Sequence, residues 1–229
     1  MQAGNSKSVS YLILGLSIIG MWSVVSHYMP VPELTSIDAF YPPPGKEWFL
    51  QQLPRYDAYP ITTALHVIPA FLFMLMVPLQ LSSWLRKKNI KFHRWIGRTF
   101  VVLSLSIIFT GFTIGIIMPF GGNIEMIASF IIGTGCLISL IIGVIRIRQK
   151  RIAEHRKWML RMLVFAFAPV TMRGVMTFGV IMFDYKASDI FGQTLLIGMA
   201  VNLLVVECWI RYTTQKKDSS STLAAATAQ

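Results

Sequence analysis

VVLSLSIIFTGFTIGIIM (residues 101–118) and FIIGTGCLISLIIGVI (residues 130–145) contain no charged side chain. A helix of about 20 apolar residues crosses the hydrocarbon core of a bilayer, and it satisfies its backbone N–H and C=O groups within its own segment. Neither block alternates apolar and polar residues, as a transmembrane β-strand would. The two blocks therefore predict transmembrane helices and an all-α fold.

Four further apolar runs surround these blocks, and the composition of the whole chain agrees with them. Apolar residues make up 54% of the 229 residues and charged residues only 14%. A soluble domain has about a quarter charged residues. We expect one integral membrane domain over residues 1–212, built as a bundle of six transmembrane helices. Their expected bounds are about 9–29, 60–84, 96–118, 123–145, 158–182 and 190–211.

Local features add detail to this bundle. Pro69 and Pro78 in the second span and Pro169 in the fifth should bend their helices, because proline has no N–H to donate. The first span is long and precedes no small-residue cleavage site, so we expect a retained anchor rather than a signal peptide. The polar segment 213–229 predicts a disordered cytoplasmic tail.

The basic residues are concentrated on one side of the predicted membrane. With a cytoplasmic N-terminus, most of the 21 Lys and Arg lie on the inner side, chiefly in segments 86–98 and 146–161, and most acidic residues lie outside. This positive-inside distribution predicts two cytoplasmic termini in a multi-pass protein of the bacterial inner membrane. The net charge of +11 then reflects contact with anionic lipids, and no nucleic-acid-binding module is found.

A long loop at residues 30–59 separates the first two spans. It contains six prolines and the segment KEWFLQQLPRY at 46–56, which is typical of a short helix lying on the outer leaflet. The loop either caps the helix ends or takes part in binding, and the sequence leaves both roles open.

Two similar motifs, FHRWIGR at 92–98 and EHRKWMLR at 154–161, stand at the start of two predicted spans. Each places a histidine beside an arginine at the inner boundary, which suggests a duplicated hairpin. Imidazole is a common axial ligand of haem iron, and a helix bundle can hold a haem between two facing rings. His93 and His155 are therefore candidate ligands of haem b iron. Arginines near them are candidates for binding the haem propionates: Arg94, Arg98, Arg156 and Arg161.

The other two histidines lie toward the outer boundary. His27 is at the end of the first span, and His66 is about 9 Å into the second. These two form a weaker candidate pair for haem because their depths differ. His66 is also suited to proton or quinone handling, since a histidine titrates near neutral pH.

Arg173, in APVTMRGVMTF, is a charged residue about 18 Å into the fifth span. Such a charge normally faces the bundle interior and has a partner. Candidate partners are Asp57, Asp184, a propionate, and the head group of a lipid or quinone. The alternative is that the side chain extends to the outer surface.

Several of these residues also have simpler explanations. His-Arg at a helix start can bind lipid phosphates, with Trp95 and Trp158 as interfacial anchors. Glu207 is expected to pair with Arg211, four residues further along its helix. Two polar residues inside apolar runs are expected to hydrogen-bond across helices: Gln80 and Asn202.

One combination of motifs extends over about residues 60–182. It consists of His66 with Pro78 and Gln80, HRWIGR at 93–98, HRKWMLR at 155–161 and TMR at 171–173. This combination resembles the bacterial predicted membrane proteins grouped as domain of unknown function 2306. The resemblance implies a multi-pass inner-membrane protein without an established activity. It marks His66, His93, His155 and Arg173 as the positions that match the family.

These observations lead to three functional hypotheses. The first is a b-type haem or quinone-linked electron-transfer module with a redox partner protein, in which His93, His155 and His66 are ligand candidates and Arg173 is a counter-charge. The second is a cofactor-free membrane protein that binds lipid or a protein partner. The third is a small-molecule transporter. No hydrolase or ATPase motif is present, and the cysteines form no CxxC or CxxCH motif.

Overall fold

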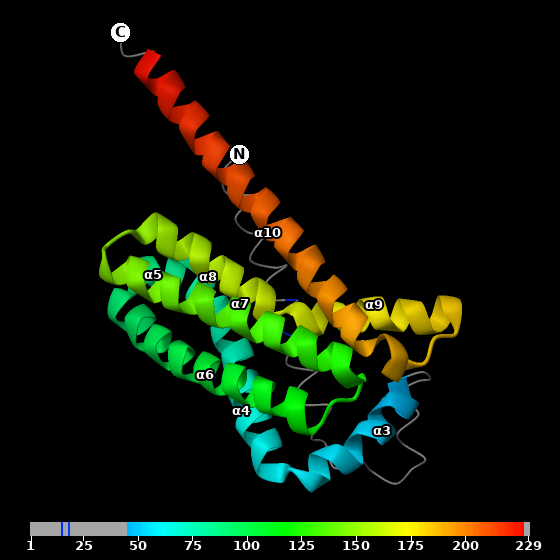
Figure 1. Ribbon diagram of the computed structural model, residues 1–229. Coiled ribbons are helices and arrows are strands. Elements are labelled where there is room, and N and C mark those ends of the chain that lie inside the picture. Colours follow the sequence, from blue (N-terminus) through cyan, green and yellow to red (C-terminus); the bar gives the residue numbers. More distant parts are fainter. Residues whose placement is uncertain (1–14, 16–17, 19–44, 227–229) are drawn as a thin grey trace.

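The computed structural model describes residues 15, 18 and 45–226, and these are almost entirely helical, with no strand among them. Apart from residues 15 and 18, the predicted span at 9–29, His27 and loop residues 30–44 lie outside the described residues. The all-α prediction is confirmed for the described part. Its main helices are α3 (Gly45–Ala58), α4 (Pro60–Leu81), α5 (Ser83–Lys88), α6 (Ile90–Ile117), α7 (Gly122–Arg148), α8 (Ile152–Ala166), α9 (Ala168–Phe183) and α10 (Ala187–Ala226), as Figure 1 shows.

Four helices are long and apolar enough to cross a membrane. They are α4, α6, α7 and the Ala187–Gln215 part of α10. The pair α8 and α9 meets the same criterion with a bend of 40° between its members, which gives a fifth span. These five segments correspond to the second to sixth predicted spans. The described chain is therefore a membrane protein with four spans, or five if the bent pair is one.

Side-chain caps start the two helices that follow α4. Ser82 Oγ accepts a hydrogen bond from the Leu85 N–H at 3.2 Å, and Asn89 Oδ1 accepts one from the Phe92 N–H at 3.0 Å. Each cap satisfies a backbone donor that the first turn of a helix leaves unpaired. The chain therefore turns twice between α4 and α6, and the last turn of α5 carries the basic residues Arg86, Lys87 and Lys88.

The predicted bend at Pro169 is confirmed as a break of the helix. α8 ends at Ala166, Phe167 joins the two helices, and Pro169 lies in the first turn of α9. A proline is tolerated there because the first N–H groups of a helix have no partner within it. By contrast, α4 is one helix through Pro69, and Pro78 lies near its end.

Two apolar cores hold the bundle together. The first, called here the α4–α8 core, consists of Phe73, Met74, Val77, Phe100, Ile108, Cys136, Leu140 and Met162. The second, the α9–α10 core, consists of Phe120, Ala128, Ala168, Met172, Met176, Phe191 and Leu195. α7 contributes side chains to both cores, so it joins the two halves of the bundle.

The C-terminal helix differs from the expectation. α10 continues through Ala226, whereas the sequence predicts disorder from residue 213. Its distal part extends beyond the other helices (Figure 1). Extending an existing helix adds one hydrogen bond per residue without a new nucleus, and the alanines near the end favour helix.

Candidate ligand-binding site

A cavity of about 300 Å³ lies where the two cores meet. Its wall includes Phe73 and Met74 of the α4–α8 core and Met172 and Phe191 of the α9–α10 core. The lining is mostly apolar, and sites for small organic molecules begin at about this volume. A minority of the described lining side chains are polar: Gln52, Arg55, Tyr56, Thr63, His66, Ser104, Glu125, Ser129 and Arg173.

His66 reaches this cavity from α4, and a residue of α6 sets the orientation of its ring. Nδ1 of His66 is 2.9 Å from Thr110 Oγ1, and the Thr110 hydroxyl is 2.6 Å from the carbonyl oxygen of Ser106. A carbonyl oxygen only accepts, so the single hydroxyl proton is donated to Ser106. Thr110 Oγ1 then accepts from the Nδ1–H, and His66 Nε2 keeps its lone pair. The ring is also close enough to the backbone carbonyl of Ile107 to hydrogen-bond with it, and this carbonyl too can only accept.

Glu125 is a buried acid at the edge of the cavity. One of its oxygens, Oε2, accepts hydrogen bonds from the backbone N–H groups of Phe120 and Gly121 at 2.5 and 2.6 Å. The guanidinium of Arg55 lies 5.3 Å from the centre of the Phe120 ring and close enough to the carboxylate for their charges to interact. Glu125 therefore holds the turn between α6 and α7 and places a negative charge beside a cation.

Other polar groups of the lining differ in what they offer to a ligand. The hydroxyls of Thr63 and Ser104 donate to backbone carbonyls one turn earlier, at 2.8 and 2.7 Å. Arg173 is half-buried on α9 and lines the same cavity as His66. Because Nδ1–H is donated, the Nε2 lone pair is the acceptor that His66 offers to a ligand.

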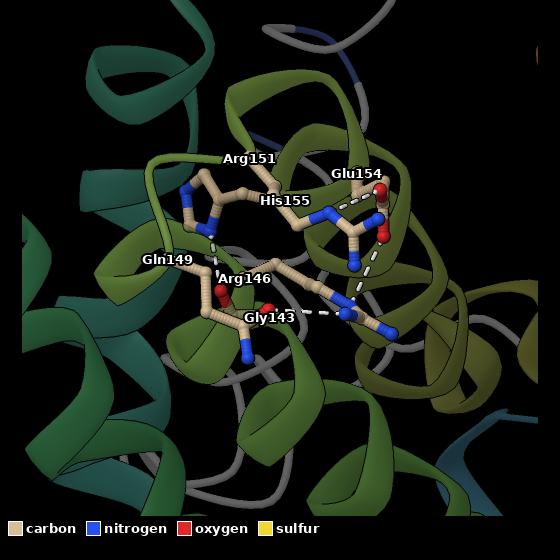
Figure 2. Close-up of polar contacts among 6 residues, drawn as sticks. All are labelled: Gly143, Arg146, Gln149, Arg151, Glu154 and His155. Carbon is tan, nitrogen blue, oxygen red and sulfur yellow. Dashed lines mark hydrogen bonds and ion pairs between the residues drawn. The ribbon is translucent and has the colours of Figure 1, made fainter.

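The opposite end of the bundle, called here the basic end, is where α4 and α7 end and α6 and α8 begin. Figure 2 shows that His155 points from α8 to α7, where its Nδ1 is 2.8 Å from the Gly143 carbonyl oxygen and donates to it. Glu154 pairs with Arg146 at 3.0 Å and with Arg151 at 2.9 Å. These contacts fasten the start of α8 to the end of α7.

Glu207 has a different partner from the one expected. Arg161 Nε donates to Glu207 Oε1 at 2.5 Å, and Arg161 Nη2 donates to Oε2 at 3.1 Å. The two-point contact joins α8 to α10, so the direct partner of Glu207 is Arg161, while the expected partner Arg211 is close enough only for its charge to act on Glu207. A planar guanidinium matches both carboxylate oxygens at once, which favours the contact between helices.

Five residues form what is called here the basic cluster: Arg86, His93, Arg94, His155 and Arg156. Their charges are close enough to interact, since His93 is influenced by Arg86, Arg94 and His155, and Arg86 by Arg156. The Nδ1 atom of His93 is buried and has no hydrogen-bond partner among the described residues. Burial and the positive charge of Arg156 lower the pKa of Arg86.

The structure thus separates the residues that the sequence singles out. His66 and Arg173 share the cavity, while His93 and His155 belong to the basic cluster. Along α6, His93 is about 25 Å from Thr110, the partner of His66. His66 is therefore too far away to share one iron with the other two histidines.

The fit of the inner pair to haem is partial. A metal-binding histidine normally donates its second ring nitrogen to a fixed acceptor, as His155 does to Gly143, but His93 Nδ1 has no such partner. Arg161, expected near a propionate, is bonded to Glu207 instead.

Comparison with known families decides what kind of chain this is. The family model described as "Predicted membrane protein (DUF2306)" matches residues 63–210, which is more than half of the chain. The chain belongs to the DUF2306 family. The matched range extends from α4 into α10, so it contains nearly all of the cavity and the whole basic cluster of this DUF2306 protein. No curated protein and no solved structure matches the chain.

Sequence reasoning missed three residues of the site in this DUF2306 protein. Thr110, which orients His66, looked like one more hydroxyl in an apolar run. Arg55 and Glu125 were not singled out. The one available signal was the spacing of Ser104 and Gly111, seven residues apart on one face of α6, and both line the cavity.

Proposed function

We propose that this protein is a multi-pass inner-membrane protein that binds a small amphipathic molecule in the cavity, and that the molecule is a quinol. The observation that carries the proposal is the orientation of His66, whose Nε2 lone pair is available while Nδ1–H is donated to Thr110. A quinol hydroxyl would donate to this nitrogen. The apolar lining would surround the ring and the start of its tail.

The shape of the cavity supports a ligand that enters from one side. Its described lining extends from α3 to Cys136 and Phe165, near the middle of α7 and the end of α8, and includes no member of the basic cluster. A transport path would have to reach both ends of the bundle. The lining therefore favours binding over transport.

The binding of a quinol is tested with the protein purified in mild detergent. Decylubiquinol and decylubiquinone are titrated by calorimetry into the wild type, His66→Phe and Ile68→Phe. Phe keeps a ring at position 66 but removes the acceptor, and Ile68 is an exposed residue on the same helix. We expect His66→Phe to weaken quinol binding about tenfold, the effect of losing one buried hydrogen bond, and Ile68→Phe to bind normally. Equal quinol affinity in all three proteins, or none in the wild type, would contradict the proposal.

The prediction that His93 and His155 ligate haem b stays a prediction. When bound, a haem would supply one-electron redox chemistry, and Arg94 or Arg156 would face its propionates. An absorbance spectrum of the purified protein, oxidised and then reduced with dithionite, tests it. A Soret band that shifts on reduction and weakens in His93→Ala would support haem, and a colourless protein from haem-replete cells would exclude it.

A further inference from the structure

Three arginines of the basic cluster come from three different helices. Arg86 lies on α5, Arg94 on α6 and Arg156 on α8. The acids described at this end are already engaged, since Glu154 pairs with Arg146 and Arg151, and Glu207 with Arg161. Among the described residues, none of the three arginines of the cluster has a carboxylate within ion-pair distance.

This arrangement of like charges is unfavourable without a ligand. Arg86 is half-buried, and its guanidinium is close enough to that of Arg156 for the two charges to repel. Arg156 is exposed, but Arg86 is partly desolvated, and a charge in a lower local dielectric constant feels a neighbouring charge more strongly than in water. An anion between the two helices would turn this repulsion into two attractive contacts.

His93 supplies a polar atom within the same group. Its Nδ1 is buried with no hydrogen-bond partner among the described residues. A buried polar atom without a partner costs free energy, and most such atoms in proteins are bonded. His93 is placed by its own backbone, since Gln80 Nε2 donates to the His93 carbonyl at 3.1 Å. This contact ties the start of α6 to the end of α4, so the helix that carries His93 is fixed at the cluster.

Large apolar side chains are exposed on the same three helices that carry the arginines of the cluster. Trp84 on α5, Trp95 on α6 and Ile152 on α8 are 66%, 62% and 62% exposed. Trp95 and Ile152 lie at the starts of α6 and α8, and Trp84 lies on the short helix between α4 and α6; tryptophan at such places marks the boundary between head groups and acyl chains. A ligand at this place would meet positive charge at its head and apolar surface along its body.

We propose that the basic cluster binds the phosphate of an anionic phospholipid. Arg86 and Arg156 donate charge-assisted hydrogen bonds to the phosphate oxygens from two separate helices, and His93 Nδ1 faces the same group. The acyl chains lie along Trp84, Trp95 and Ile152. Basic pockets between transmembrane helices bind lipid head groups in this way. The proposal is independent of the cavity and of its ligand.

The test uses the full chain purified in dodecyl maltoside. Dioctanoyl phosphatidylglycerol and dioctanoyl phosphatidylcholine are titrated, and bound lipid is counted by native mass spectrometry. The variant is Arg86→Gln/Arg156→Gln. The matched control is Lys87→Gln/Arg148→Gln, which removes the same charge from exposed residues of α5 and α7. We expect the wild type and the control to retain phosphatidylglycerol, and the variant to bind it about tenfold more weakly or less.

Thermal unfolding separates a binding role from a structural one. Without lipid, the melting temperature of Arg86→Gln/Arg156→Gln should equal or exceed that of the wild type, because the repulsion is gone. Added phosphatidylglycerol should raise the melting temperature of the wild type and not that of the variant. A variant that is less stable without lipid would show that the arginines serve folding and would overturn the proposal.

Three other results would also overturn it. If the variant and the control lost the same amount of bound lipid, the loss would come from the change in net charge and not from a specific site. If inorganic phosphate, at the same concentration as the lipid, raised the melting temperature of the wild type equally, the site would be one for a soluble anion. A Soret band that weakens in the arginine variant would assign it to haem propionates.

Discussion

A single hydroxyl group decides what His66 presents to the cavity. Neutral imidazole has one donor and one acceptor nitrogen, and the ring uses whichever arrangement its neighbours permit. Thr110 gives its only proton to the Ser106 carbonyl, so it can only accept from His66. Thr110, which does not itself line the cavity, therefore determines which ring nitrogen of His66 can accept a hydrogen bond from a ligand.

Thr110→Val tests this control of the ring. Valine has nearly the same shape but accepts no hydrogen bond, so Nδ1 loses the Thr110 oxygen as an acceptor and its proton is held there less strongly. We expect the ratio of decylubiquinol to decylubiquinone affinity to fall about tenfold or less, because Nε2–H donates to the quinone carbonyl. Thr113→Val, which changes an exposed threonine on the same helix, is the control. An unchanged ratio in Thr110→Val would mean that Thr110 does not fix the tautomer.

The contact of Arg161 with Glu207 gives a second prediction for individual residues. Arg161→Met and Glu207→Gln should each lower the melting temperature, and the double variant should lose less than the sum of the two. We expect a coupling free energy on the order of 1 kcal/mol, because both side chains are partly exposed. Arg211→Gln should have little effect. If the effects of Arg161→Met and Glu207→Gln on stability simply added, or if Arg211→Gln lowered the melting temperature more than either, Glu207 would depend on Arg211 and not on Arg161.

Whole elements were easier to predict than the contacts between them. The apolar runs identified the helices because lipid leaves the backbone no other partner, and Pro169 identified the break in the fifth span. Gln80 and Asn202 were correctly expected to bond across helices. The partner of Glu207 was missed because spacing within one helix carries no information about which other helix packs against it. The role of Thr110 was missed for the same reason.

Two glycines of α10 determine how closely this helix packs, although neither was noted in the sequence. A Cβ atom on Gly198 would stand 2.8 Å from the carbonyl oxygen of Ala168 and 2.8 Å from the Met172 nitrogen, both backbone atoms of α9. A Cβ on Gly192 would stand 2.5 Å from the backbone nitrogen of Glu125 on α7. Backbone atoms cannot turn aside as a side chain can, so α10 is in direct contact with two helices.

Gly198→Ala should therefore be destabilising. The added methyl must push α10 from α9, and overpacking of this kind costs about 1–3 kcal/mol. Gly174→Ala is the matched control, since nothing lies within 4 Å of its added Cβ, and it should be neutral or stabilising by up to about 1 kcal/mol. Thermal unfolding in detergent measures both. If the two variants melt alike, the close packing of α10 on α9 is wrong.

At the scale of the whole molecule, the cavity and the basic cluster occupy opposite ends of one bundle. We propose that the basic end faces the cytoplasm, because positive residues collect on the inner side of membrane proteins. The cavity would then lie in the periplasmic half of the membrane. The orientation therefore determines from which side a ligand would reach His66.

Reporter fusions test the orientation. Green fluorescent protein fused after residue 229 should fluoresce, and alkaline phosphatase at the same place should be inactive, because the C-terminus is expected in the cytoplasm. The opposite pair of results would place the cavity on the cytoplasmic side. As a control, phosphatase inserted between α6 and α7 should be active.

The polar contacts of α10 have a consequence for where this helix stops along its own axis. Asn202 bonds to Thr171 and to the Val164 carbonyl, and Glu207 bonds to Arg161. A shift by one helical turn would leave all of these groups unpaired in an apolar setting. These contacts therefore fix the position of α10 along its own axis. They also fix the height at which Phe191 and Leu195 of α10 line the cavity.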